Sequence, residues 1–165
     1  MSEIRKFNFS YLEFESIGEL TGEDQELISA AREAAKNAYA PYSKFRVGAA
    51  LRLGSGQIVS GSNVENAAFP SGICAERTAL AASVSNYPGD YPVTLAIAAL
   101  TENGLTDDAV SPCGNCRQVI AEEEHRTGKP IKLILAGKKY IRIIESVSDL
   151  LPLQFTRDNL TSDRP

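Results

Sequence analysis

Hydrophobic residues recur at helical spacing in the first long patterned segment of the chain. From Thr21 to Ala38, aliphatic and small residues return every three or four positions, which predicts an amphipathic helix. Thr21 is a good N-cap residue, and Glu23 and Asp24 suit the positive end of the helix dipole. Because proline disfavours helical backbone in the residue before it, we expect the helix to end at Pro41.

Strand-like segments follow this helix. Residues 45–53 and 57–63 flank a Gly-Ser-Gly turn at 54–56, and this pattern predicts a hairpin. Residues 93–100 and 131–136 are continuous apolar runs of strand length, typical of strands buried on both faces of a sheet.

Helical segments separate these strands. Residues 74–85 are rich in alanine, and a further helix is expected after Cys113. A last strand is predicted over residues 140–144, after the turn at 137–139. This alternation of strands and helices indicates a layered α/β domain.

The two ends of the chain lack a regular pattern. Residues 1–20 are rich in Phe and Tyr without helical spacing, so we expect an arm that packs onto another surface. Residues 156–165 are polar and are expected to fray. Because neither a repeat nor a linker is visible, the sequence predicts a single domain over residues 1–165.

The overall composition is that of an ordinary soluble protein. With 43% hydrophobic and 23% charged residues, neither disorder nor a fibrous repeat is favoured. The net charge of −4 argues against a nucleic-acid partner, because such proteins present basic surfaces to phosphates. No apolar segment resembles a signal peptide or a membrane span, so we expect a cytoplasmic protein without a membrane partner.

The chain has a single histidine, which excludes a metal site with two histidines. His125 lies in a polar segment that closes on Gly128, and we expect it to be solvated at a helix end. This position disfavours Ser-His-Asp and Cys-His mechanisms. The three cysteines, an odd number, argue against a disulfide framework.

All three cysteines lie where predicted helices begin. Cys74 opens the first of these helices, and Cys113 and Cys116 open the second, after Pro112. The free N–H groups of a helix N-terminus favour the thiolate over the thiol. Three thiolates are the number of protein ligands that a catalytic Zn²⁺ uses when its fourth position is left to water.

Other interpretations of the cysteines stay open at this point. A thioredoxin-like redox pair uses Cys-x-x-Cys, but it follows the first strand of a βαβ unit and needs no third cysteine. A structural zinc site would need a fourth protein ligand, and His125 is poorly placed to supply it. The cysteines could also be unrelated small residues of the core.

Glu76 favours the catalytic interpretation. It lies two positions after Cys74, in the first turn of an otherwise apolar helix. A carboxylate there can simply stabilise the helix dipole. Beside a zinc-bound water, however, it is placed to accept a proton. Zinc deaminases combine cysteine ligands, a Pro-Cys-x-x-Cys motif and a glutamate that is not a ligand.

With these motifs, the chain closely resembles the cytidine deaminase family, in its short, three-cysteine branch. The similarity extends over residues 24–155. It rests on the segments YAPYSKF at 39–45, VGAA at 47–50, NVENA at 63–67, ICAERTA at 73–79, SPCGNCRQV at 111–119 and LLP at 150–152 with Phe155.

The resemblance implies a fold and an activity. The implied fold is a three-layer α/β/α sandwich with a mixed sheet of about five strands. The implied activity is the hydrolytic deamination of cytidine and 2′-deoxycytidine to uridine and 2′-deoxyuridine, with release of ammonia, in pyrimidine salvage. The resemblance also implies a homotetramer.

The resemblance assigns roles around one Zn²⁺ per subunit. Cys74, Cys113 and Cys116 would bind the metal. Glu76 would move protons from the water to the ring N3 and then to the departing amine. Arg77 would donate hydrogen bonds to ligand sulfurs, although it could instead be an ordinary surface cation.

The resemblance also assigns the substrate contacts. Asn63 and Glu65 match residues that hydrogen-bond the ribose 3′-hydroxyl, although both could simply cap a loop. Phe45 matches the aromatic residue that faces the pyrimidine, although a strand Phe is usually core. Ala75 would contact the base through its backbone, and Phe155 would enter a neighbouring subunit's pocket.

Two positions depart from the common family pattern. Arg46 replaces a frequent Pro, and Phe69 stands where a Tyr is common. We expect catalysis to survive both changes and specificity to be more sensitive. Blasticidin-type nucleoside deaminases share the zinc motifs and are the closest alternative; a polynucleotide deaminase and a zinc-stabilised binding module are the others.

Overall fold

The computed structural model of the chain describes residues 2–160. In chain order, its strands and α-helices are β1 (Leu12–Phe14), α1 (Gly22–Lys36), β2 (Arg46–Leu53), β3 (Ile58–Ser62), α2 (Ala75–Asn86), β4 (Pro92–Thr101), β5 (Gly104–Leu105), α3 (Gly114–Thr127), β6 (Lys132–Ala136) and β7 (Ile141–Ile144). Short 3₁₀ turns occur at Ile17–Glu19, Phe69–Ser71, Val147–Leu150 and Arg157–Asn159.

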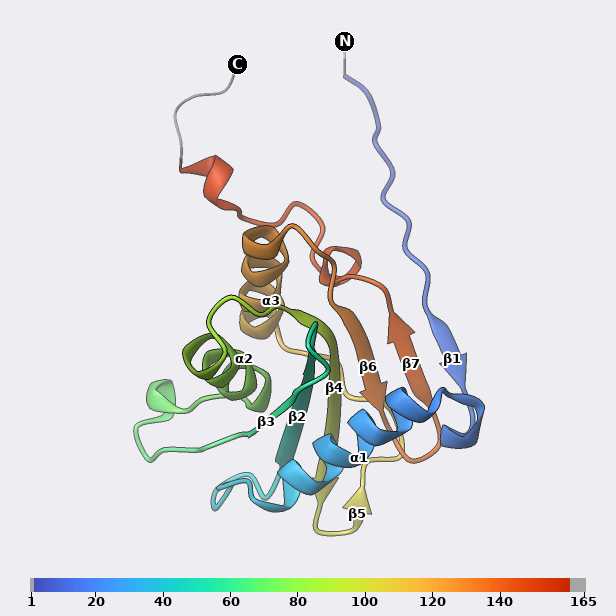
Figure 1. Cartoon of the computed structure of the whole chain (residues 1–165), viewed down its shortest axis with the longest axis vertical. Helices are drawn as coiled ribbons and strands as arrows, with labels where there is room; N and C mark the ends of the chain where they lie inside the picture. Colours follow the sequence, from blue (N-terminus) through green and yellow to red (C-terminus); the bar gives the residue numbers. More distant parts are fainter. Residues whose placement is uncertain (1, 161–165) are drawn as a thin grey trace.

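The strands form one mixed sheet in the order β1-β7-β6-β4-β2-β3, and β5 pairs with the end of β4. β4 and β6 are parallel, and the other pairs are antiparallel. Helix α1 covers one face of the sheet, and α2 and α3 cover the other (Figure 1). The predicted α/β/α sandwich is therefore confirmed. The sheet has seven strands rather than about five, because β1 and β5 are too short to leave a sequence pattern.

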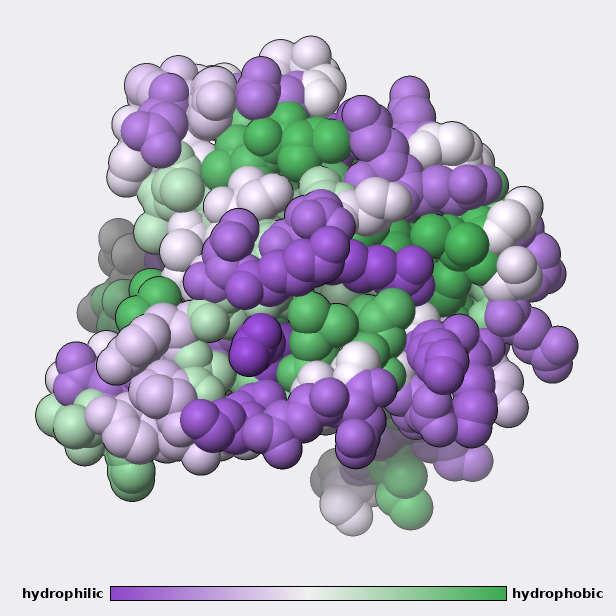
Figure 2. Space-filling view, turned by 90° about the horizontal axis from the view of Figure 1, so that it is seen from below, coloured by the Kyte–Doolittle hydropathy of each residue, from purple (hydrophilic) through white to green (hydrophobic). Residues whose placement is uncertain are grey.

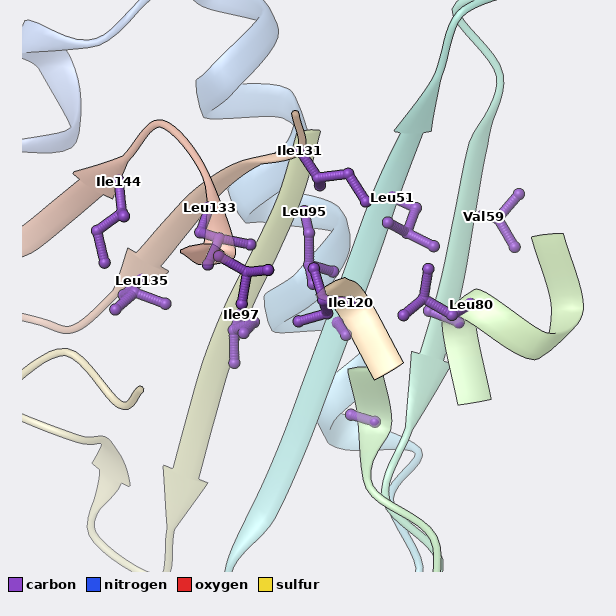
Figure 3. Close-up of a cluster of buried hydrophobic side chains, with 14 of the residues drawn as sticks. Leu51, Val59, Leu80, Leu95, Ile97, Ile120, Ile131, Leu133, Leu135 and Ile144 are labelled. Atoms are coloured by element: carbon purple, nitrogen blue, oxygen red, sulfur yellow. The ribbon is translucent and has the colours of Figure 1, made fainter. Parts of the chain in front are cut away.

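Strand β4 carries the core on both faces, as its continuous apolar run predicts. Leu95 and Ile97 point toward α2 and α3, whereas Ala96 and Ala98 point toward α1. Figure 3 shows the larger of the two clusters, in which side chains of the sheet meet Leu80 of α2 and Ile120 of α3. This packing fixes the positions of α2 and α3, the two helices that begin at the cysteines.

Two glycines allow the helices to lie directly on the sheet. A Cβ at Gly48 of β2 would lie 2.0 Å from the carbonyl oxygen of Ala31 in α1. A Cβ at Gly61 of β3 would lie 2.4 Å from the backbone nitrogen of Ala79 in α2. Neither position has room for a larger residue unless the helix moves away from the sheet.

Helix α1 begins as predicted and ends earlier than predicted. The Thr21 hydroxyl accepts a hydrogen bond from the backbone N–H of Asp24. The helix stops at Lys36, five residues before Pro41. The reason is tertiary: the Tyr39 backbone pairs with that of residues 63 and 65, which draws the chain out of the helix.

The N-terminal arm is attached through β1. Leu12–Phe14 pairs with β7, and Glu13 forms an ion pair of 2.7 Å with Arg142. The preceding residues run away from the sheet (Figure 1), with Phe7 and Phe9 exposed. At the other end, a 3₁₀ turn occupies part of the polar tail, and residues 161–165 lie outside the described part.

Hydrophobic residues on the face seen in Figure 2 form separate patches between hydrophilic bands. Within residues 2–160, no helix has the length and apolar character that crossing a membrane requires.

Candidate metal centre and active-site cavity

The fold brings the three cysteines together from two helices. Cys74 is the N-cap of α2, Cys113 is the N-cap of α3, and Cys116 lies in the first turn of α3. Their three sulfur atoms all lie within 4.8 Å of one another, and those of Cys113 and Cys116 are 3.5 Å apart. The sulfurs of the two N-cap cysteines therefore lie close together where α2 and α3 begin.

The surroundings affect the three thiols differently. Burial raises the pKa of Cys74 and that of Cys116, and the charge of Glu76 adds to both effects. At Cys113 burial opposes ionisation, but the Cys116 backbone N–H, followed by the thiols of Cys116 and Cys74, outweighs it and lowers the pKa. Two of the three thiolates therefore need a positive charge to stabilise them.

The donor set fits a zinc ion. Tetrahedral thiolate ligands at a Zn–S distance of about 2.3 Å are about 3.8 Å apart, so sulfurs within 4.8 Å of one another need little adjustment. A cation would also stabilise the thiolates that burial disfavours. Cys74, Cys113 and Cys116 would hold one zinc per subunit, and a fourth position would remain for water.

Glu76 is a buried carboxylate beside this cluster. It is 5% exposed, and burial raises its pKa. The Glu76 backbone N–H, the nearby Cys116 thiol and the charge of Arg77 partly offset the effect of burial. A carboxylate with elevated proton affinity next to a metal site is suited to take up and return protons.

The cluster lies at a cavity of about 730 Å³, a typical size for a small-molecule site. Five of the residues predicted to act in catalysis or substrate binding line this cavity with Cys74 and Cys113: Phe45, Asn63, Glu65, Ala75 and Glu76. Ala75 is completely buried in the first turn of α2, where backbone N–H groups lack helical partners.

Asn63 and Glu65 both hold backbone beside the cavity. The Asn63 side chain accepts a hydrogen bond of 2.7 Å from the Val47 N–H and donates one of 3.0 Å to the Phe45 carbonyl. The amide keeps one N–H and one lone pair for another partner. The capping role is therefore observed, and it leaves room for a contact with a ligand.

The Glu65 carboxylate binds the loop that covers one side of the cavity. It accepts hydrogen bonds from the Tyr42 N–H at 2.9 Å, the Ser43 N–H at 3.3 Å and the Ser43 hydroxyl. The Ser43 hydroxyl contributes most to lowering the pKa of Glu65. The pKa of Glu65 is therefore lowered, whereas that of Glu76 is raised.

Three predicted site residues do not line this cavity, namely Cys116, which is completely buried in the cluster, Arg77 and Phe155. Phe155 is exposed and lines a second cavity between α2 and α3, together with Arg77. Within the described part of the chain, no hydrogen bond joins the Arg77 guanidinium to a cysteine sulfur. Its charge acts on Glu76 instead. The roles expected for Arg77 and Phe155 stay predictions.

Sequence reasoning missed an aromatic pair at the cavity. The rings of Tyr42 and Phe69 meet edge to face at 5.9 Å between centroids, and both residues line the cavity. They lie in different loops without periodic spacing, so no sequence signal indicated the contact. His125 also differs from expectation, because it is half-buried and its Nε2 atom has no hydrogen-bond partner in residues 2–160.

Comparison with known proteins agrees with this geometry. A family model described as "Cytidine and deoxycytidylate deaminase zinc-binding region" matches residues 21–128. The cytidine deaminase of Sporosarcina psychrophila is 40% identical over 83% of this chain and 94% of its own length. That of Halalkalibacterium halodurans is 42% identical over 82% of this chain and 96% of its own. The crystal structure of cytidine deaminase from Burkholderia pseudomallei superposes with a TM-score of 0.69 at 37% identity, covering 82% of this chain and all of the other.

Proposed function

The chain belongs to the cytidine and deoxycytidylate deaminase family, and from this premise we propose that it hydrolyses cytidine to uridine and ammonia. One observation carries the proposal. Three thiols able to bind zinc and a buried carboxylate meet at a cavity of nucleoside size. A zinc-stabilised binding module would not need Glu76, because an apolar residue would pack there without the cost of a buried charge.

The reaction replaces the 4-amino group of cytosine with oxygen. Zinc, when bound, lowers the pKa of water so that it is nucleophilic near neutral pH. Glu76 takes a proton from the water and delivers it to the ring N3 as the new C4–O bond forms. It then takes the proton of the new C4 hydroxyl and gives it to the amine, so that the C4–N bond breaks, ammonia leaves and the C4 carbonyl of uridine forms.

The two helix N-termini support this chemistry electrostatically. Three thiolates around one divalent ion leave a net negative charge, which weakens the metal as a Lewis acid. Cys74 and Cys113 both lie at the positive ends of helix dipoles, which reduce that charge. We also assign to Arg77 the role of a nearby cation for the cluster, on the strength of its effect on Glu76.

The substrate contacts are proposed from the cavity lining. Phe45 would contact the pyrimidine face, and a free N–H at Ala75 would hydrogen-bond the base. Asn63 and Glu65 would bind the ribose 3′-hydroxyl with the donor and acceptor capacity that their loop contacts leave unused. The same contacts would admit 2′-deoxycytidine, because none of them requires the 2′-hydroxyl.

We further propose a cytoplasmic homotetramer that acts in pyrimidine salvage. The support is the position of Phe155, which is exposed and outside its own subunit's cavity, so it is available to enter a neighbour's. A light-scattering mass of four times 17.8 kDa is expected. A monomeric mass would overturn this assignment for Phe155.

Purified protein tests the proposed function. Cytidine and 2′-deoxycytidine should lose absorbance as the uridine products and ammonia form, with about one zinc bound per chain. Blasticidin S distinguishes the closest alternative substrate. Bound zinc without turnover of any cytosine nucleoside would contradict the proposal and favour a binding module.

A further inference from the structure

The segment at residues 146–155 is tied to α3 by side chains of the helix at three levels. Glu124 accepts hydrogen bonds from the Val147 N–H at 3.1 Å and from the Ser146 hydroxyl at 2.8 Å. Gln118 donates one of 2.8 Å to the Phe155 carbonyl. Most of these partners are backbone groups of the segment. The helix side chains can therefore bind the segment without depending on its side chains.

Arg117 ties the same segment to the candidate metal centre. Its Nε atom donates a hydrogen bond of 2.8 Å to the Pro112 carbonyl, and its Nη1 atom donates one of 2.9 Å to the Leu150 carbonyl. Pro112 directly precedes Cys113. The donors of a guanidinium lie in one rigid plane, so Arg117 fixes the two carbonyls relative to each other.

The start of α3 restrains the Cys113 backbone through its carbonyl, which accepts a hydrogen bond of 2.9 Å from the Arg117 N–H. The Cys113 side chain itself is at the surface, whereas Pro112 is buried. Cys113 follows residues 106–112, which form neither helix nor strand. A Cβ at the next residue, Gly114, would meet no atom within 4 Å. The Arg117 side-chain hydrogen bond to Pro112 therefore adds a restraint at the residue before Cys113, where the incoming loop meets the helix.

We propose that Arg117 is a positioning residue that holds Cys113 in place for zinc and couples zinc binding to the order of residues 151–155. The inference rests on the proposed zinc site. When zinc binding holds Cys113 and the adjoining Pro112 in place, the Arg117 guanidinium is also held, and its hydrogen bond to the Leu150 carbonyl is favoured. By linkage, the effect is reciprocal: an ordered C-terminal segment strengthens zinc binding, and bound zinc orders the segment.

The coupling reaches Phe155, which the function proposed above assigns to a neighbouring subunit. Gln118, next to Arg117, holds the Phe155 carbonyl. Loss of zinc from one subunit would thus loosen the segment that carries Phe155 toward the next.

Two variants and a matched control test the proposal on the full chain. Arg117→Gln removes both guanidinium bonds, and Arg117→Lys keeps the charge but can reach only one carbonyl. Arg126→Gln is the control, because Arg126 lies on the same helix and pairs with Glu123, at 2.9 and 2.6 Å, instead of with the metal loop. Zinc Kd is measured by competition with a chromophoric chelator, and amide hydrogen exchange at residues 151–155 is followed with and without zinc.

Arg117→Gln should raise the zinc Kd about 10–100-fold, the usual effect of losing an outer partner of a metal ligand. Arg117→Lys should give a smaller rise, and Arg126→Gln should leave the Kd within twofold of wild type. Zinc should slow exchange at residues 151–155 in wild type and in Arg126→Gln, and much less in Arg117→Gln. If Arg117→Gln does not fold, Arg117→Lys carries the same test.

The proposal would be overturned if neither Arg117 variant changed the zinc Kd. It would also be overturned if zinc did not change amide hydrogen exchange at residues 151–155 of the wild type. Cytidine turnover by the wild type separates this outcome from failure of the proposed function. If wild-type protein binds zinc but does not turn over cytidine, the proposed function is wrong, and the zinc Kd values still test the coupling. If turnover is normal and the Arg117 variants leave the zinc Kd unchanged, only the proposed coupling is wrong.

Discussion

The thiol cluster has two halves, Cys74 at the start of α2 and Cys113 with Cys116 at the start of α3, and different interactions surround them. Cys74 begins a helix that lies directly on β3, where a Cβ at Gly61 would approach Ala79 to 2.4 Å. Cys113 begins a helix at an exposed position, and Arg117 hydrogen-bonds the carbonyl of the preceding Pro112. The core holds both helices, but close backbone packing places Cys74, whereas we propose that a polar side chain, Arg117, helps to place Cys113.

This difference matches what each half has to do. The first half also carries Glu76, which must stay close to the reacting atoms while it moves protons, and it is buried. The second half presents Cys113 at the surface, where an ion can arrive. The carboxylate assigned to proton transfer is therefore in the buried half, and the exposed ligand is in the other.

The largest effect is expected to be common to both halves. Cys116→Ala removes one of three zinc ligands, and Cys74→Ala does the same from the other helix. Zinc binding should weaken by more than the 10–100-fold that loss of an outer partner typically causes, and deamination should fall to background. Metal analysis after dialysis against a chelator checks this, and full zinc content in either variant would contradict the assigned ligand set.

The same glycine substitution in each half sharpens the comparison. Gly61→Ala should destabilise the metal-free protein by about 1–3 kcal/mol, because its Cβ meets the α2 backbone. Gly114→Ala should not destabilise it, because its Cβ meets nothing within 4 Å, and the loss of backbone freedom in the unfolded chain favours folding by up to about 1 kcal/mol. Urea unfolding measures both; equal losses would mean that packing does not distinguish the halves.

The smallest effect concerns the rim of the cavity. Ser43→Ala removes the hydroxyl that contributes most to lowering the pKa of Glu65, so that pKa should rise. Glu65 then becomes protonated at a higher pH, and KM for cytidine should begin to increase at a higher pH on acidification than in wild type. A KM profile across the acidic range tests this. Superimposable profiles would argue against a ribose contact by Glu65.

The regular part of the fold follows from the sequence because burial determines it. The apolar run that became β4 is buried on both faces, and the Thr21 cap starts α1 as predicted. The early end of α1 at Lys36 was not predictable, because backbone bonds from Tyr39 to distant residues determine it. The short strands β1 and β5 likewise depend on their partners rather than on their own residues.

In the candidate site, too, some features were predictable from the sequence and others were not. Cys74, Cys113, Cys116 and Glu76 were predicted together because helix starts and motif spacing place them, and the structure brings them together. The contacts of Arg117 were missed because its acceptors are backbone carbonyls, which any sequence presents. Motif residues and helix starts can be identified from a sequence, whereas side-chain hydrogen bonds to distant backbone carbonyls cannot.

The most direct test of the account compares wild-type protein with Glu76→Gln, assayed for zinc content and cytidine deamination. Glutamine keeps the size of the side chain but cannot carry the proton. Both proteins should bind about one zinc per chain, and Glu76→Gln should show at least the 10²–10⁴-fold loss of kcat typical of losing general acid–base catalysis. Near-normal turnover by Glu76→Gln with zinc bound would contradict the role assigned to Glu76.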